Sequence, residues 1–127
     1  MENFLNKLVN DAEKRVQEGY YDLNKTSQHK PISLSRQIKN AARNAIIAEI
    51  KPISPALGPL KPKIDPVEAA LKFQQGGAVG LSILTEPDNF GGSITNLIHV
   101  RPRTKLPILM KDIIIDQKQI SAASKWS

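Results

Sequence analysis

Charged side chains stand where two apolar segments of the sequence end, at Glu49-Ile50-Lys51 and at Met110-Lys111-Asp112. In an extended chain alternate side chains share a face, so Glu49 and Lys51 would lie on the same side of a strand. Opposite charges that face a protein interior are costly unless they are paired or have a function. Taken alone, the first motif is also explained by a structural ion pair, and the second by a lysine that reaches solvent.

Lys51 and Lys111 together are more informative than either motif alone. If both follow parallel strands, their ammonium groups converge on one cavity, because the carboxyl ends of parallel strands meet at one edge of a sheet. A lysine desolvated beside a second cation can act as an acid near neutral pH, or it can hold a phosphate or a carboxylate as a point charge. The pair therefore predicts a site for a small anionic ligand.

Two loops contain further residues that could contribute to such a site. Ser54-Pro55 and Gly58 follow the first apolar segment, where they would either wrap a ligand or form a rigid connector. Phe90-Gly91-Gly92-Ser93 precedes a predicted helix, and it could bind an anion or simply turn the chain and cap the helix. His29 and His99 are isolated and the chain has no cysteine, so no metal site is predicted.

Apolar periodicity predicts the elements that must position these side chains. An amphipathic helix is predicted from Met1 to about Asp22 with Gly19 as its stop, and a second from Ser33 to Ala42. Three apolar segments typical of buried strands follow, at residues 45–50, 78–84 and 107–110. The helices after these strands are predicted to begin near Asp65-Pro66, Ser93 and Asp116.

This order of elements predicts an α/β fold with a parallel sheet and right-handed crossovers. The loop at residues 51–59 contains three prolines and a glycine, so no regular structure is predicted there. A closed barrel of eight strand–helix units needs about 250 residues, and this chain has 127.

The composition is that of an ordinary globular chain, 40% hydrophobic and 24% charged, and the length of 127 residues suggests one domain. No segment is long and apolar enough for a signal peptide or a membrane span, so a soluble cytoplasmic protein is expected. The net charge of +6 favours either nucleic acid or a small anionic substrate such as a sugar phosphate. The positive residues are scattered, without interleaved aromatic residues, which disfavours nucleic acid.

Three ordered motifs resemble those of the indole-3-glycerol phosphate synthases. They are Ile46-Ile47-Ala48-Glu49-Ile50-Lys51 with Ser54-Pro55 and Gly58, then Gly76-Gly77-Ala78 through Thr85 to Phe90-Gly91-Gly92-Ser93, and then Leu106 through Asp112 with Ile115 and Gln119-Ile120. The resemblance covers about residues 44–123. Any one motif would be weak, but three in the same order are specific.

The resemblance implies a (β/α)8 TIM barrel, of which this chain would hold an N-terminal helical extension (1–43) and the first three β/α units (44–127). It also implies a carboxy-lyase reaction of tryptophan biosynthesis. In that reaction 1-(2-carboxyphenylamino)-1-deoxyribulose 5-phosphate closes a ring and loses carbon dioxide and water, which yields indole-3-glycerol phosphate. The family uses no metal and no organic cofactor for this reaction.

By position in the motifs, Lys111 resembles the family's general acid, Lys51 the second active-site lysine near the phosphate, and Glu49 the carboxylate that orients both. The residues implied to bind substrate are a first-loop serine, an aromatic residue against the anthranilate ring and an apolar strand-end residue: Ser54, Phe90 and Leu84. Many members have an aromatic residue where this chain has Ile113, so a less aromatic slot is expected.

The family's later catalytic residues would lie beyond Ser127. We therefore expect a truncated enzyme with little or no activity by itself, which self-associates through the exposed edges of a half-barrel. Two other functions stay open. One is a non-catalytic half-barrel that binds an anion or a partner chain, and the other is a different phosphate-handling TIM-barrel enzyme.

Overall fold

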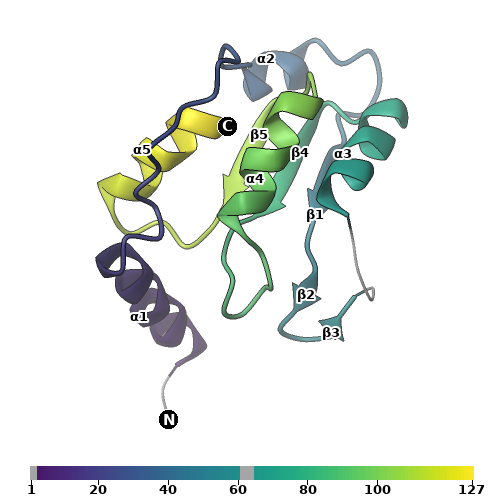
Figure 1. Ribbon diagram of the computed structural model, residues 1–127. Coiled ribbons are helices and arrows are strands. Elements are labelled where there is room, and N and C mark those ends of the chain that lie inside the picture. Colours follow the sequence, from purple (N-terminus) through teal and green to yellow (C-terminus); the bar gives the residue numbers. More distant parts are fainter. Residues whose placement is uncertain (1–2, 61–64) are drawn as a thin grey trace.

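Three parallel strands form the centre of the computed structural model, which describes residues 3–60 and 65–127 (Figure 1). β1 (Ile47–Ile50), β4 (Gly80–Leu84) and β5 (Ile108–Lys111) lie side by side in the order β1-β4-β5. The register places Glu49 opposite Ser82 and Leu84 opposite Lys111. The predicted α/β fold with a parallel sheet is confirmed, and the described strands form an open sheet, which is consistent with the expected partial barrel.

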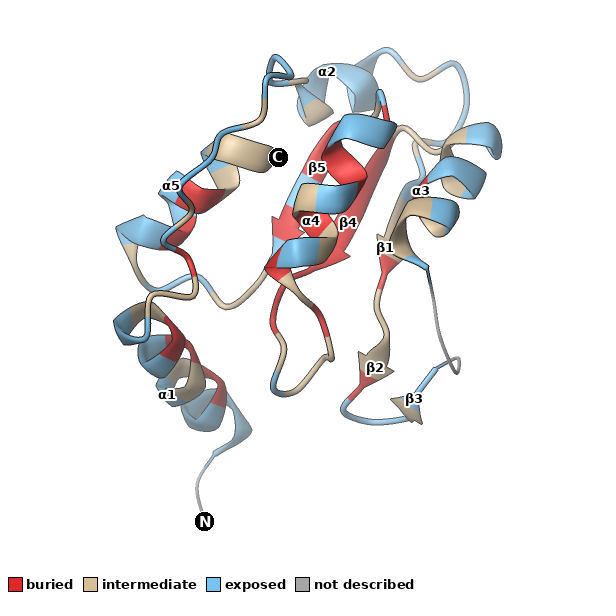
Figure 2. Ribbon diagram, viewed as in Figure 1, coloured by how far each residue is buried: buried red, intermediate tan, exposed pale blue. Residues whose placement is uncertain are grey.

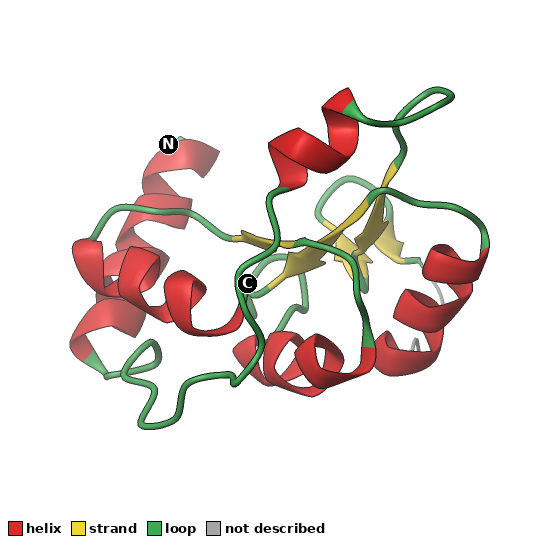
Figure 3. Ribbon diagram, turned by 90° about the horizontal axis from the view of Figure 1, so that it is seen from above, coloured by secondary structure: helices red, strands yellow, loops and turns green. Residues whose placement is uncertain are grey.

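Helices connect the strands along one side of this sheet. α3 (Pro66–Gln75) lies between β1 and β4 in the sequence, α4 (Ile94–Val100) lies between β4 and β5, and α5 (Gln117–Trp126) follows β5. A short 3₁₀ helix, η1 (Arg101–Arg103), continues from the end of α4. Seen from above in Figure 3, α3, α4 and α5 lie on one side of the strands and α2 (Leu34–Lys39) lies on the other.

The two N-terminal helices lie at opposite ends of the sheet. α1 (Phe4–Gln17) lies near the carboxyl ends of the strands, whereas α2 lies near their amino ends (Figure 1). The Leu34 side chain comes so close to Gly80 that a Cβ at Gly80 would be 2.5 Å from its Cδ1 atom. The part of the chain before β1 therefore contacts both ends of the sheet.

Side-chain caps explain where the helices begin. The Asp65 carboxylate accepts hydrogen bonds from the backbone N–H groups of Val67 and Glu68, with Pro66 at the first helical position. The predicted caps at the other helix starts also form: Ser33, Ser93 and Asp116. Both N-terminal helices are shorter than predicted, because α1 ends at Gln17 and α2 at Lys39.

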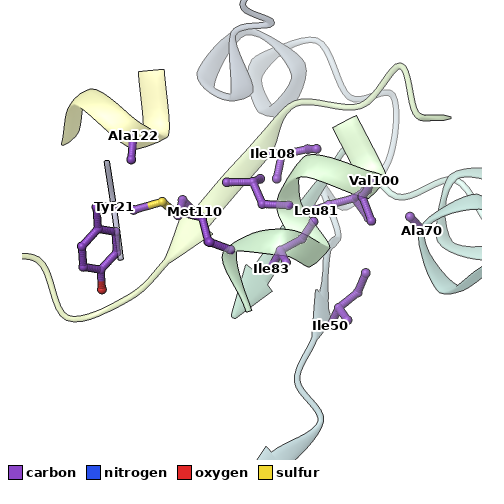
Figure 4. Close-up of a cluster of buried hydrophobic side chains, with 11 residues drawn as sticks. Tyr21, Ile50, Ala70, Leu81, Ile83, Val100, Ile108, Met110 and Ala122 are labelled. Carbon is purple, nitrogen blue, oxygen red and sulfur yellow. The ribbon is translucent and has the colours of Figure 1, made fainter. Parts of the chain in front are cut away.

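An aliphatic core forms between the sheet and the helices on its covered side. All five residues of β4 are buried, and Figure 2 shows the buried residues concentrated in the central strands. Figure 4 shows Leu81 and Ile83 beside Val100, with Tyr21, Met110 and Ala122 at one end of the cluster. Burial of these apolar side chains is the main favourable contribution to folding.

The structure differs from the sequence-based predictions in two places near β1. A short antiparallel hairpin forms where no regular structure was predicted, from β2 (Ile53–Ser54) and β3 (Gly58–Pro59). Gly58 has a φ of +71°, which lets the chain reverse. Pro59 has no backbone N–H to donate, and a strand as short as β3 tolerates this at its end. The prediction that the first strand is buried on both faces is wrong, since Ile47 is 41% exposed.

The helices in the described parts of the chain, residues 3–60 and 65–127, are too short or too polar to cross a lipid bilayer.

Gly92 is a position where the fold requires glycine. A Cβ at Gly92 would lie 2.2 Å from the backbone oxygen of Leu84. Neither atom could move away by a side-chain rotation, because both positions are set by the backbone. We expect Gly92→Ala to lower the free energy of unfolding by about 1–3 kcal/mol through this overlap. Gly76→Ala is the matched control, because its nearest neighbour would be at 3.4 Å. Urea unfolding of both variants would measure the difference, and equal stabilities would contradict the close approach at Gly92.

Candidate functional site

The Glu49 carboxylate connects all three parallel strands on the face of the sheet opposite α3, α4 and α5, which we call the uncovered face. Its Oε2 atom accepts hydrogen bonds from Ser82 Oγ at 2.9 Å and from Lys111 Nζ at 2.7 Å. The Lys51 ammonium lies 3.8 Å from the other carboxylate oxygen. This contact agrees with the expectation that Glu49 and Lys51 share a face, and one carboxylate thus meets both predicted lysines.

The charges in this group favour an ionised carboxylate. Partial burial acts to raise the pKa of Glu49, but the hydrogen bonds from Lys111 and Ser82 and the charges of both lysines outweigh it, so the pKa lies below its ordinary value. Two cations therefore surround the Glu49 carboxylate, while Glu86 and Asp112, which line a small cavity with the lysines, pair with Arg15. The two ammonium groups can attract an anionic ligand.

Two cavities meet at Lys111. The smaller, of about 110 Å³, is lined by Lys51 and Lys111, by the carboxylates Glu86 and Asp112, and by three apolar side chains: Leu84, Phe90 and Ile113. The larger, of about 530 Å³, lies over the uncovered face of the sheet and includes Ile47, Glu49 and Leu109. Lys111 and Asp112 line both cavities, so the end of β5 borders the two.

Glu86 holds the loop that carries Phe90. One carboxylate oxygen of Glu86 accepts hydrogen bonds from the backbone N–H groups of Asn89 at 2.8 Å and Phe90 at 2.9 Å. The backbone oxygen of Phe90 accepts a hydrogen bond from Ile53 N–H at 3.1 Å, which connects the loop to the β2–β3 hairpin. The aromatic wall of the smaller cavity is thus positioned by a buried carboxylate and by a neighbouring loop.

The structure brings most of the predicted site residues together. Of the three candidate catalytic residues, Glu49 contacts both Lys51 and Lys111, and Leu84 and Phe90 line the cavity beside the two lysines. Ser54 lies in β2, where it is buried, and it is not among the residues that line either cavity in the described part of the chain. Among residues 3–60 and 65–127, no three His, Asp or Glu side chains are grouped so as to hold a metal ion.

Sequence reasoning missed the side chains that support this site from behind. Arg15 in α1 pairs with Glu86 and Asp112, two buried carboxylates that are among the lining residues of the smaller cavity. The spacing of Arg15 from Leu8 and Ala12 was the available signal, because all three fall on the buried face of α1. An arginine at a core position of an amphipathic helix indicates a buried acidic partner.

Comparison with known proteins agrees with the resemblance seen in the motifs. The sequence profile of the family described as indole-3-glycerol phosphate synthase matches residues 3–127. The chain is 45% identical over 86 residues to the indole-3-glycerol phosphate synthase of Hyphomonas neptunium, which covers 68% of this chain and 32% of the relative.

Two further relatives extend the match. With the indole-3-glycerol phosphate synthase of Oceanobacillus iheyensis, identity is 44% over 91 residues, or 72% of this chain and 35% of the relative. With that of Carboxydothermus hydrogenoformans, identity is 36% over 133 positions, or 94% of this chain and 50% of the relative. The chain thus spans about a third to a half of the length of the curated relatives it matches.

Replacement of Lys111 by Met should raise the pKa of Glu49, because a hydrogen bond and a positive charge are lost while partial burial remains. In the unsubstituted protein the pKa of Glu49 is lower when folded than when unfolded. The contacts of Glu49 therefore contribute stability above the unfolded pKa, and this is lost as the pH falls through the folded pKa. In Lys111→Met the folded pKa lies closer to the unfolded pKa, so this contribution should be smaller and should be fully lost at a higher pH.

Carbon-13 NMR titration of the Glu49 carboxyl group measures this shift. Lys72→Met is the matched control, because Lys72 is exposed on α3 and pairs with Glu68 instead. An unchanged pKa of Glu49 in Lys111→Met would contradict the contact between the two side chains.

Proposed function

The chain belongs to the indole-3-glycerol phosphate synthase family, and from this premise we propose that it takes part in forming indole-3-glycerol phosphate in tryptophan biosynthesis. The proposed substrate is 1-(2-carboxyphenylamino)-1-deoxyribulose 5-phosphate, and the proposed activity is that of a carboxy-lyase. The observation that carries the proposal is the contact of one carboxylate, Glu49, with the ammonium groups of Lys51 and Lys111.

Lys111 is proposed as the general acid of ring closure. The aryl carbon that bears the carboxylate attacks the ketone carbon of the sugar chain, and the ketone oxygen takes up a proton from the ammonium group. The new carbon–carbon bond places a positive charge in the ring system, and departure of carbon dioxide returns its bonding electrons to the ring. Glu49, at 2.7 Å from Lys111 Nζ, would orient the donor.

Lys51 is proposed to act at the following dehydration and near the substrate phosphate. Its flexible side chain ends in a point charge that suits a phosphate, and its position in the smaller cavity supports this role. A proton delivered to the departing hydroxyl group releases water. Loss of a proton from the carbon next to the ring nitrogen then forms the remaining double bond of the indole. The same Glu49 carboxylate, 3.8 Å away, would restrain this second lysine.

Leu84 and Phe90 are proposed to hold the anthranilate ring, together with Ile113. These side chains are apolar walls of the cavity that also contains both lysines. Aromatic and aliphatic walls with a few convergent polar groups are typical of small-molecule sites. Ser54 is proposed to reach the same substrate from the first loop.

We also propose the domain organisation, partner, compartment and self-association that the sequence predicts. Residues 1–43 would form the helical extension and residues 44–127 the first three β/α units of the barrel. The partner would be a small sugar phosphate rather than nucleic acid, and the compartment would be the cytoplasm. A second copy of the chain would associate with the outer edges of β1 and β5.

The proposed activity can be tested with a complementary half-enzyme supplied in trans. The alignment with the Carboxydothermus hydrogenoformans relative covers 50% of that relative, so its uncovered half can be expressed separately and mixed with this chain. We expect indole fluorescence from product in the mixture, and a fall in kcat of roughly 100- to 10,000-fold with Lys111→Met, the loss typical for a general acid.

Lys72→Met serves as the control here also, because it removes an equal charge from an exposed position on α3. Equal turnover by the unsubstituted chain and Lys111→Met would contradict the role of Lys111. Absence of turnover in a mixture that gel filtration shows to be associated would contradict the proposed activity.

A further inference from the structure

Arg15 joins the N-terminal helix α1 to the two loops that border the candidate site. Its guanidinium group reaches Glu86 at 3.1 Å and Asp88 at 2.5 Å in the loop after β4. It also reaches Asp112 at 3.4 Å, directly after β5. The side chain is 5% exposed, so these contacts lie inside the protein. One cation from a distant part of the sequence therefore contacts both loops at once.

The two buried carboxylates need this cation. The Glu86 and Asp112 side chains are 1% and 0% exposed, and a buried anion is costly without a counter-charge and hydrogen bonds. Burial opposes the charge on Arg15, but its contacts with Tyr21, Asp88 and Asp112 outweigh burial, so the pKa of Arg15 is raised and the group stays protonated. The planar guanidinium can serve several oxygens, which an ammonium group cannot do with the same geometry.

Each buried carboxylate in turn positions one wall of the candidate site. Glu86 accepts the backbone N–H groups of Asn89 and Phe90, and so sets the place of the aromatic wall. Asp112 follows Lys111 in the chain, and its carboxylate accepts hydrogen bonds from Thr85 Oγ1 at 2.7 Å and from the Ile113 N–H at 2.8 Å. Arg15 thus connects the supports of the aromatic wall and of the lysine.

Two tyrosines just after α1 strengthen the same connection. The Tyr21 hydroxyl donates a hydrogen bond to Asp112 at 2.8 Å, and burial raises the pKa of Tyr21 to about 12, so it remains a donor. The Tyr20 hydroxyl donates to the backbone oxygen of Thr85 at 2.7 Å and accepts from Ile94 N–H at 2.9 Å. The rings of the two tyrosines pack edge to face, with their centroids 4.9 Å apart.

We propose that Arg15 is a positioning residue of the active site: by holding Glu86 and Asp112 together, it sets the distance between the Phe90 wall and the Lys111 ammonium group. This inference rests on the proposed function, because it assigns the separation of these two groups a role in binding the substrate. It makes α1 a part of the active-site scaffold, although α1 contributes no lining residue to the smaller cavity among the residues described.

Amide hydrogen exchange on the full chain tests the coupling without any turnover. In Arg15→Met we expect the amides of Asn89, Phe90 and Ile113 to exchange faster by on the order of tenfold, while the β4 amides stay protected. Arg15→Lys keeps the positive charge but lacks the planar guanidinium with its several N–H donors, so it should give a smaller increase in the exchange rates. Lys14→Met is the matched control, since Lys14 is the neighbouring residue of α1 with a side chain 73% exposed.

The turnover assay with the complementary half then separates positioning from simple loss of fold. A misplaced wall weakens substrate binding, so Arg15→Met should raise KM about tenfold, and Arg15→Lys should partly restore it. A merely structural role would lower the amount of active protein and hence the apparent kcat, with KM unchanged.

Unchanged exchange at the three loop amides, or an equal increase in β4, would overturn the proposal whatever the turnover. An unchanged KM in Arg15→Met would overturn it as well. If exchange changes as expected but the unsubstituted mixture forms no product, the coupling by Arg15 is supported and the proposed activity is the part that fails.

Discussion

The parallel register of β1, β4 and β5 is the constraint on which the rest of this structure depends. It places Glu49 opposite Ser82 on the uncovered face, and it brings Lys111 from the far strand to the same carboxylate. A shift of one residue would turn these side chains to the opposite face of their strand. Leu81 and Ile83 of β4 pack in the core with Ile50, Ile108 and Met110, so aliphatic packing on one face of the sheet fixes the register and determines where the charges meet on the other.

Alternation along β5 separates two ionic groups of opposite character. Lys111 and Asp112 are consecutive, yet Lys111 contacts Glu49 on the uncovered face while Asp112 contacts Arg15 in the interior. The first group has an excess of positive charge and borders an open hollow, as a site for an anion requires. The second group is enclosed and contains more carboxylates than cations among the described residues, so it suits a structural support rather than an anion-binding site.

Local signals in the sequence were sufficient for most of the fold. A helix start such as Asp65-Pro66 depends on hydrogen bonds to residues at most three positions further along the chain. The strands could be recognised as short, continuous apolar segments. The β2–β3 hairpin was not predicted, because the prolines of this loop favour irregular structure and each strand of the hairpin has only two residues. The meeting of Lys51 and Lys111 followed from the rule that parallel strands share a carboxyl edge. The Arg15 group did not follow, since its partners lie 71 to 97 positions away.

These long separations make the candidate site dependent on how α1 packs against the loops after β4 and β5. β1, β4 and β5 pair through their crossovers, and the chain between α1 and β1 lets Arg15 reach across the formed sheet to the loops after β4 and β5. Without Arg15, two carboxylates near the carboxyl ends of β4 and β5 lack their cation and favour hydrated, open loops. The sheet alone brings the two lysines to one carboxylate, whereas the cavity beside them also depends on the first helix, because Arg15 pairs with the two carboxylates that line it.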